Sequence, residues 1–256
     1  MRRAGVALVL AAAVGLSACS SQSTQVTGGR TSQEALESYT SLGLQYLRAG
    51  DTSTAKGPLL RALEIDSDYA PAFNGLALVF QSENEPELAE QYFRKAVDAD
   101  SQSAMIRNNF GAFLFGEERY QEACHQLSRA TEDPFYQQRA QAFENLGRCY
   151  RRLERLDAAE HAFNRALTLS RQRPVALIEL ADIQLIKNQP VQAAILFERF
   201  RELVEEKRVD HFALSLWVGV RVARYEGRAG QAATYALLLK NMYPESEEYR
   251  LYEESR

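Results

Sequence analysis

Residues with the chemistry to catalyse a reaction are few and scattered along this chain. The three histidines, His125, His161 and His211, occur singly, and there is no HExxH, GxSxG, P-loop or paired CxxC motif. Cys124 and His125 are adjacent, but neighbouring helical residues point about 100° apart, which disfavours a nucleophile and base pair. We therefore expect no catalysis, metal, cofactor or small-molecule substrate; the alternative is an enzyme whose polar cluster has no recognisable motif.

Cys19 has a different chemistry, because it follows the features of a secretory signal. A basic head of two arginines precedes residues 4–16, an uncharged apolar run that is too short to span a bilayer. Residues 16–19, LSAC, are similar to the bacterial lipobox, in which diacylglycerol is attached to the cysteine sulfur before the peptide is cut. We expect residues 1–18 to be the signal peptide and Cys19 to carry a covalent lipid. The alternative is an ordinary signal with an incidental cysteine.

The segment after Cys19 is polar. From Ser20 to about Ser32 the chain is mostly Ser, Thr, Gln and Gly, and such a segment cannot offset its ordering entropy. We expect residues 19–34 to be a lipidated, flexible tether. Ser20 stands where enterobacterial lipoproteins of the inner membrane usually have Asp, so the resemblance implies lipid anchoring at the periplasmic face of the outer membrane.

Composition predicts a globular domain that does not bind nucleic acid. Hydrophobic residues make up 46% of the chain and charged residues 25%, as in folded proteins. Removing Arg2 and Arg3 with the signal peptide changes the formal net charge from -4 to -6. No basic stripe compensates for this acidity, so we expect no nucleic-acid partner.

A pattern of small and large apolar residues recurs about every 34 residues. It places a small residue in each expected first helix, at Gly43, Ala77, Gly111, Gly147 and Ala181, and in each second helix, at Ala55, Ala89, Ala123, Ala159 and Ala193. Small residues let two antiparallel helices approach closely. The pattern resembles the tetratricopeptide repeat, a helix-turn-helix unit, which implies an all-α, right-handed solenoid. An unrelated helical bundle, the alternative, would not keep these positions in phase.

The spacing of the pattern sets the expected domain boundaries. We expect six repeats over residues 35–246, starting near residues 36, 70, 104, 140, 174 and 213, and a C-terminal tail over residues 247–256. The spacing rises to 36 residues around Asp133-Pro134 and to 39 around residues 202–209, where we expect loops or extended helix ends.

Two further cysteines fall in helices that would pack together. Cys124 lies in the expected second helix of repeat three, and Cys149 lies in the first helix of repeat four. In an oxidising periplasm they could form a disulfide that acts as a structural staple. Two buried thiols are the alternative, and we expect this state.

In such a solenoid the first helices line the concave surface. The residues expected there form a partner-binding groove with an apolar floor: Leu44, Leu47, Asn74, Leu78, Met105, Asn108 and Phe115. Asn74 and Asn108 recur at one repeat position, where an amide could hold the backbone of an extended peptide. Arg148, Arg151 and Arg152 would form a basic band beside it. The alternative is that some of these residues belong to the core between repeats.

Several stretches carry a narrower resemblance: YLRAGD at 46–51, PLLRALEID at 58–66, ALVFQ at 77–81, NNFG at 108–111 and FENLG at 143–147. They are similar to the PilF/PilW family of type IV pilus biogenesis lipoproteins, also called secretin pilotins. The resemblance implies an outer-membrane lipoprotein whose partner is the pilus secretin, and which promotes the localisation and multimerisation of secretin subunits. A general envelope scaffold lipoprotein, serving outer-membrane protein or cell-wall complexes, is the alternative.

Overall fold

The computed structural model describes residues 28–256, so the expected signal peptide and Cys19 lie outside the described residues. Residues 28–256 contain thirteen α-helices and no strand. Twelve of the helices form six antiparallel pairs: α1 (Gly28–Arg48) with α2 (Thr52–Ile65), α3 (Ala70–Ser82) with α4 (Pro86–Ala99), α5 (Ala104–Gly116) with α6 (Tyr120–Ala130), α7 (Arg139–Arg152) with α8 (Leu156–Leu169), α9 (Pro174–Ile186) with α10 (Pro190–Glu205), and α11 (Ala213–Tyr225) with α12 (Ala229–Met242).

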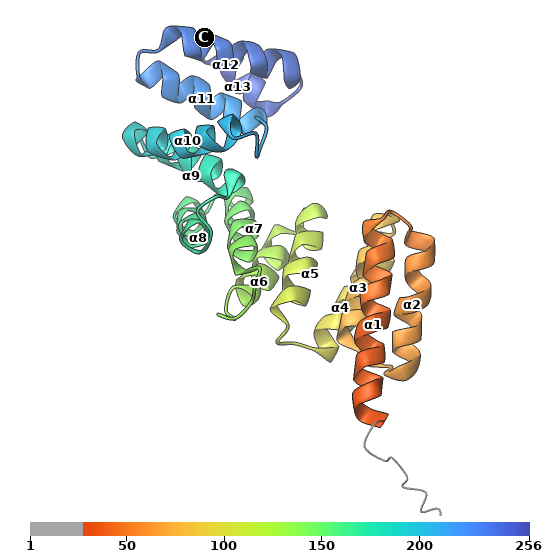
Figure 1. Ribbon diagram of the computed structural model, residues 1–256. Coiled ribbons are helices and arrows are strands. Elements are labelled where there is room, and N and C mark those ends of the chain that lie inside the picture. The colour runs from red at the N-terminus through yellow and green to blue at the C-terminus, as the bar shows by residue number, and fades with distance from the viewer. Residues whose placement is uncertain (1–27) are drawn as a thin grey trace, which may run out of the picture.

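The pairs stack one after another into an elongated all-α solenoid (Figure 1). Each pair packs mainly against the next one along the chain, as expected for repeats that bury their apolar faces against neighbours. We call repeats one to three (α1 to α6) the first half, and repeats four to six, with the helix after them, the second half. None of the described helices is long and apolar enough to cross a membrane.

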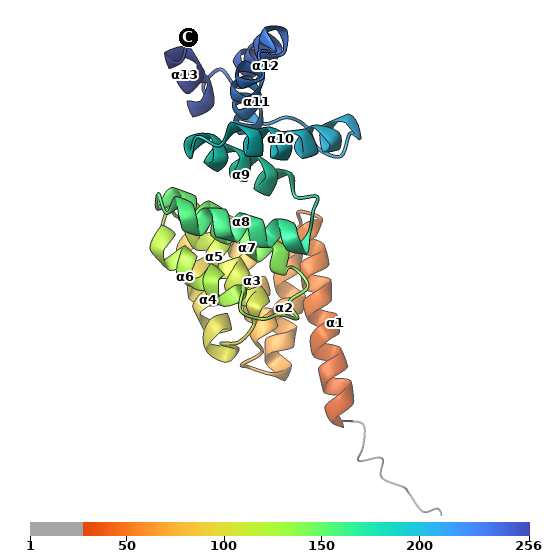
Figure 2. The ribbon, with the colours of Figure 1, turned by 90° about the vertical axis from the view of Figure 1, so that its left-hand side faces the viewer.

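The two ends of the domain differ from expectation. Helix α1 begins at Gly28, so the tether expected over residues 19–34 is wrong for its last part, and α1 projects beyond α2 (Figure 2). Residues 28–34 extend a helix that is already nucleated by the first repeat. Within it, Gln33 Nε2 donates a hydrogen bond to Glu37 Oε1 at 2.8 Å. At the other end, the expected tail forms helix α13 (Glu247–Glu254), which folds back beside α11 and α12.

Close packing within each pair depends on the small residues. A Cβ on Gly43 would lie 2.6 Å from Leu59 Cγ, and a Cβ on Gly147 would lie 2.7 Å from Phe163 Cε1. The five repeating alanines of the second helices are fully buried. The in-phase positions of the sequence therefore bring the two helices of each pair together, as predicted.

The turns inside the pairs share one backbone conformation. A residue with a φ between 56° and 81° follows the first helix of every repeat, at Gly50, Asn84, Glu118, Glu154, Asn188 and Gly227. This left-handed residue ends the helix and lets the chain reverse into the second helix. The longer spacings lie between pairs: residues 131–138 form a loop, and α10 extends to Glu205.

Candidate functional site

The apolar residues predicted for the groove lie on the first helices of the first half. Leu44, Leu47, Leu78 and Phe115 are half-buried, and Met105 is 40% exposed. Leu47 packs against the cluster around Leu59, and Leu78 and Phe115 pack against the cluster around Phe93, so these three belong in part to the core between repeats. Each of the five leaves apolar surface open for a partner.

The prediction for Asn74 and Asn108 is wrong. They are only 2% and 6% exposed. Asn109 Nδ2 donates to Asn74 Oδ1 at 3.1 Å, and Asn145 Nδ2 donates to Asn108 Oδ1 at 3.0 Å. The amides therefore join α3 to α5 and α5 to α7 instead of facing a peptide, because a buried amide needs hydrogen-bond partners inside the protein.

At this repeat position, α1 and α7 carry a residue other than asparagine. Thr40 is the corresponding residue of α1, and it is buried with no hydrogen-bond partner for its hydroxyl among the described residues. Glu144 is the corresponding residue of α7, and it accepts from Arg173 Nη2 at 2.8 Å and from the Ala176 backbone N–H at 3.2 Å. From α7 onward, charged contacts replace the amide contacts.

A large hollow opens between the first helices of repeats three to six and α13, with a volume of about 890 Å³. We call it the arginine hollow. Its lining comprises Phe115 from α5, Arg148, Arg151 and Arg152 from α7, Glu154 from the turn after α7, Leu156 from the start of α8, Glu179, Asp182 and Ile186 from α9, Leu214, Trp217 and Arg221 from α11, and Glu247, Glu248 and Leu251 from α13.

Two arginines of the hollow are neutralised by buried acids. Asp182, whose side chain is 5% exposed, accepts from Arg151 Nη2 at 2.5 Å and from Arg221 Nη1 at 2.6 Å. Arg151 Nε also lies 3.3 Å from Glu179 Oε2. Burial raises the pKa of Glu179, and the nearby Arg151 charge opposes that rise. Arg151 therefore joins α7 to α9 and does not belong to an open basic band.

Arg148 and Arg152 are different, because both are exposed and neither lies within 4 Å of a carboxylate in residues 28–256. The Arg148 guanidinium lies over the Phe115 ring, 5.1 Å from its centre, and that of Arg152 lies over Tyr120 at 5.9 Å. Such stacking orients the cation and leaves its N–H edge free. The hollow thus presents two free positive charges, one helical turn apart.

The sequence analysis did not predict that α13 would form one side of the arginine hollow. Ser246 accepts a hydrogen bond from the Tyr249 backbone N–H at 3.2 Å and begins the helix as an N-cap. Tyr249 and Tyr252 pack against the cluster that contains Trp217. The segment EEYRLYEE could have indicated this helix, because it places two tyrosines at helical spacing directly after the Ser246 cap.

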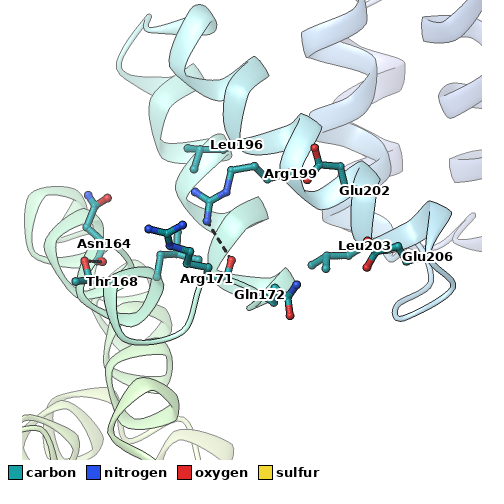
Figure 3. A pocket seen from close by; sticks show the side chains of 10 residues that line it. Asn164, Thr168, Arg171, Gln172, Leu196, Arg199, Glu202, Leu203 and Glu206 are labelled. Atoms are coloured by element: carbon teal, nitrogen blue, oxygen red, sulfur yellow. Dashed lines mark hydrogen bonds between the residues drawn. The ribbon is translucent and has the colours of Figure 1, made fainter.

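A second hollow, of about 600 Å³, lies on the side formed by the second helices of repeats four and five (Figure 3). Asn164 and Thr168 of α8 face Arg199 and Glu202 of α10 across it, and Arg199 Nη2 donates to the Arg171 carbonyl at 3.0 Å. Its charges are mixed. No group of three or more metal-ligating side chains occurs anywhere in the described chain.

Cys124 and Cys149 form a disulfide, with their Cα atoms 5.6 Å apart. The expectation of two buried thiols is therefore corrected. The disulfide joins α6 to α7, because the second helix of one repeat packs against the first helix of the next. It links the two halves of the solenoid.

A stack of six helix pairs with a hollowed inner face defines a tetratricopeptide-repeat scaffold, a class of proteins that bind other proteins. Two models of the tetratricopeptide repeat match residues 40–104 and 102–172.

Over nearly its whole length the chain is also similar to a particular kind of scaffold. It is 38% identical to the type IV pilus assembly protein PilF of Pseudomonas aeruginosa, over 96% of this chain and 97% of that protein. A solved structure of PilF from the same species superposes with a TM-score of 0.80 over 88% of this chain and 100% of the other. PilW, a type IV pilus biogenesis factor, is 29% identical and superposes with a TM-score of 0.69 over 85% and 97%. The chain belongs to the PilF family of type IV pilus assembly proteins.

Proposed function

We propose that this protein is a pilotin, an outer-membrane lipoprotein without catalytic activity that binds subunits of the pilus secretin and promotes their multimerisation. The observation that carries the proposal is the similarity to PilF over almost the full length of both chains. A scaffold of stacked repeats with an open apolar inner face supports a role in holding a protein client.

Lipid on Cys19 would hold the domain at the inner leaflet of the outer membrane. Bacterial lipoproteins carry two or three acyl chains, and two chains are enough for stable anchoring. Anchoring would keep the solenoid close to the membrane, which raises its effective concentration for a membrane-bound client. Binding through the groove can therefore be of modest affinity.

The client segment would lie along the first half of the inner face. Leu44, Leu47, Leu78, Met105 and Phe115 offer apolar surface there, and burying that surface would provide the binding free energy. The buried asparagines take no part in this contact, since they are hydrogen-bonded between repeats.

The proposal is tested by measuring the SDS-resistant secretin multimer in cells. Leu44→Asp combined with Leu78→Asp should reduce the multimer to the level of a deletion strain, because charges would replace the apolar contact. The matched control is Leu60→Asp with Ile65→Asp, which places the same charges on exposed positions of α2 and should leave the multimer unchanged.

Circular dichroism would establish that both double variants are folded. A normal multimer in the folded Leu44 and Leu78 variant would contradict the position of the groove. A normal multimer in the deletion strain would contradict the pilotin role and favour a general envelope scaffold.

A further inference from the structure

We propose that the arginine hollow is a second docking site, which binds an extended acidic segment of a protein partner through Arg148 and Arg152. The site adjoins the apolar surface of the first half and shares Phe115 with it. The partner is defined by its chemistry: two carboxylates followed by apolar side chains. The proposal does not require that partner to be the secretin.

The two arginines of the hollow that form no ion pair within residues 28–256 select the occupant. Of the carboxylates in the lining, Glu179, Asp182 and Glu247 are in ion pairs, and Glu154 and Glu248 lie outside α7. Asp182 neutralises Arg151 and Arg221, so these two arginines hold the helices together. Arg148 and Arg152 have no such partner, and each is already oriented over an aromatic ring. A guanidinium held in this way binds carboxylates with its free edge, in short charge-assisted hydrogen bonds.

The spacing of the two arginines matches an extended chain. Four residues of a helix rise about 6 Å, and alternate side chains of an extended segment lie about 6.7 Å apart on one side. Carboxylates at positions i and i+2 of the segment would therefore meet Arg148 and Arg152 together. A helical segment is about 10–12 Å across and would fill the 890 Å³ of the hollow with fewer than about two turns.

The side of the hollow that α11 and α13 form determines the direction in which the segment would lie. Ile186 is 51% exposed and lies with Trp217 and Leu251 in the hollow, where it offers apolar surface. Glu247 and Glu248 of α13 stand at the same side, and Glu247 is paired with Arg250. These acids would repel a carboxylate. Near α7, Glu179 is paired with Arg151 and Glu154 lies past the end of the helix, so the acidic residues of the segment lie at Arg148 and Arg152 and its apolar residues toward α11 and α13.

The test uses the purified mature chain and fluorescein-labelled eight-residue peptides, with binding measured by fluorescence anisotropy. The probe carries Asp at its third and fifth positions and Leu and Ile at its sixth and seventh. Control peptides replace both Asp by Asn or by Lys, or move the second Asp next to the first. We expect the probe to bind at least about tenfold more tightly than each control at low salt, and less tightly as salt screens the charges.

Variants locate the binding. Arg148→Glu with Arg152→Glu should weaken the binding of the probe by at least about tenfold, and Arg148→Gln with Arg152→Gln, which is milder for folding, should weaken it by a smaller factor. The matched control, Arg171→Glu with Lys240→Glu, changes the net charge equally at exposed positions outside the hollow and should leave affinity within about twofold.

Three results would overturn the proposal: no binding of the probe up to about 1 mM, equal binding of the Asp and Asn peptides, or unchanged binding by the folded Glu and Gln variants. None of these results bears on secretin assembly, which is measured in cells with the Leu44 and Leu78 variant. A failure of this site is thus distinguishable from a failure of the pilotin role.

Discussion

The two halves of the solenoid share their packing but differ in the polar contacts between neighbouring repeats. In the first half, neutral amides join successive first helices, as between Asn109 and Asn74. In the second half, buried ion pairs such as Asp182 with Arg151 and Arg221 occupy the inner face. Amides leave the surrounding surface apolar, whereas the ion pairs lie beside surplus arginines that remain free. One scaffold therefore offers two chemically different surfaces.

The disulfide between Cys124 and Cys149 links the two halves covalently, and its contribution to stability can be measured. Closing a segment of 25 residues is expected to stabilise the fold by about 3 to 4 kcal/mol. Reduction should lower the free energy of unfolding in urea by that amount, and the combined substitution Cys124→Ser and Cys149→Ser should do the same. Equal stability of the oxidised and reduced protein would mean that the disulfide does not stabilise the contact between α6 and α7.

Breaking one amide contact made by the first half and one ionic contact of the second half compares their strengths. Asp182→Ala leaves the partly buried Arg221 without a carboxylate and Arg151 with Glu179 alone, and should cost about 3 kcal/mol. Asn108→Ala removes one neutral hydrogen bond and should cost about 1 to 2 kcal/mol. Urea unfolding of both variants measures the difference. A loss at Asn108 as large as that at Asp182 would erase the distinction between the halves.

Close packing should show no such difference, since both halves use the same small residues. Gly43→Ala and Gly147→Ala each place a Cβ within 2.7 Å of a buried side chain and should each destabilise the fold by about 1 to 3 kcal/mol. Gly57→Ala in α2 meets no atom within 4 Å and should stabilise the protein by about 0.5 to 1 kcal/mol. Thermal melting of the three variants checks this. A large cost in only one half would show that the packing is not shared.

The smallest expected effect is a pH dependence that arises from His211, in the second half. Burial lowers the pKa of His211, and the neighbouring Asp210 charge opposes that effect. The unfolded chain therefore binds a proton before the folded one, and this contribution to stability, complete above a pH of about 6.5, is lost as the pH falls toward the folded pKa.

His211→Gln removes the titration, and its side-chain amide can still hydrogen-bond to the Ser215 hydroxyl, which lies 3.0 Å from His211 Nδ1. Between pH 8 and 5 the wild type should lose more stability than this variant in urea unfolding. Parallel pH profiles would contradict the assignment.

The repeat architecture was predictable from sequence because small residues at a fixed spacing determine how closely two helices pack. The expected starts near residues 70, 104, 174 and 213 coincide with the first residues of α3, α5, α9 and α11. The site was less predictable. Repeat position alone could not show that Asn74 faces the next repeat, or that Arg151 is neutralised while Arg148 is free, since both depend on partners more than thirty residues away.

Hydrogen exchange of the chain, alone and with the purified periplasmic part of the secretin, tests the central claim that the client lies on the inner face of the first half. The account predicts slower exchange in α1, α3 and α5 and no change in α2 and α4. Protection confined to α2 and α4, or no protection while the secretin binds, would contradict it.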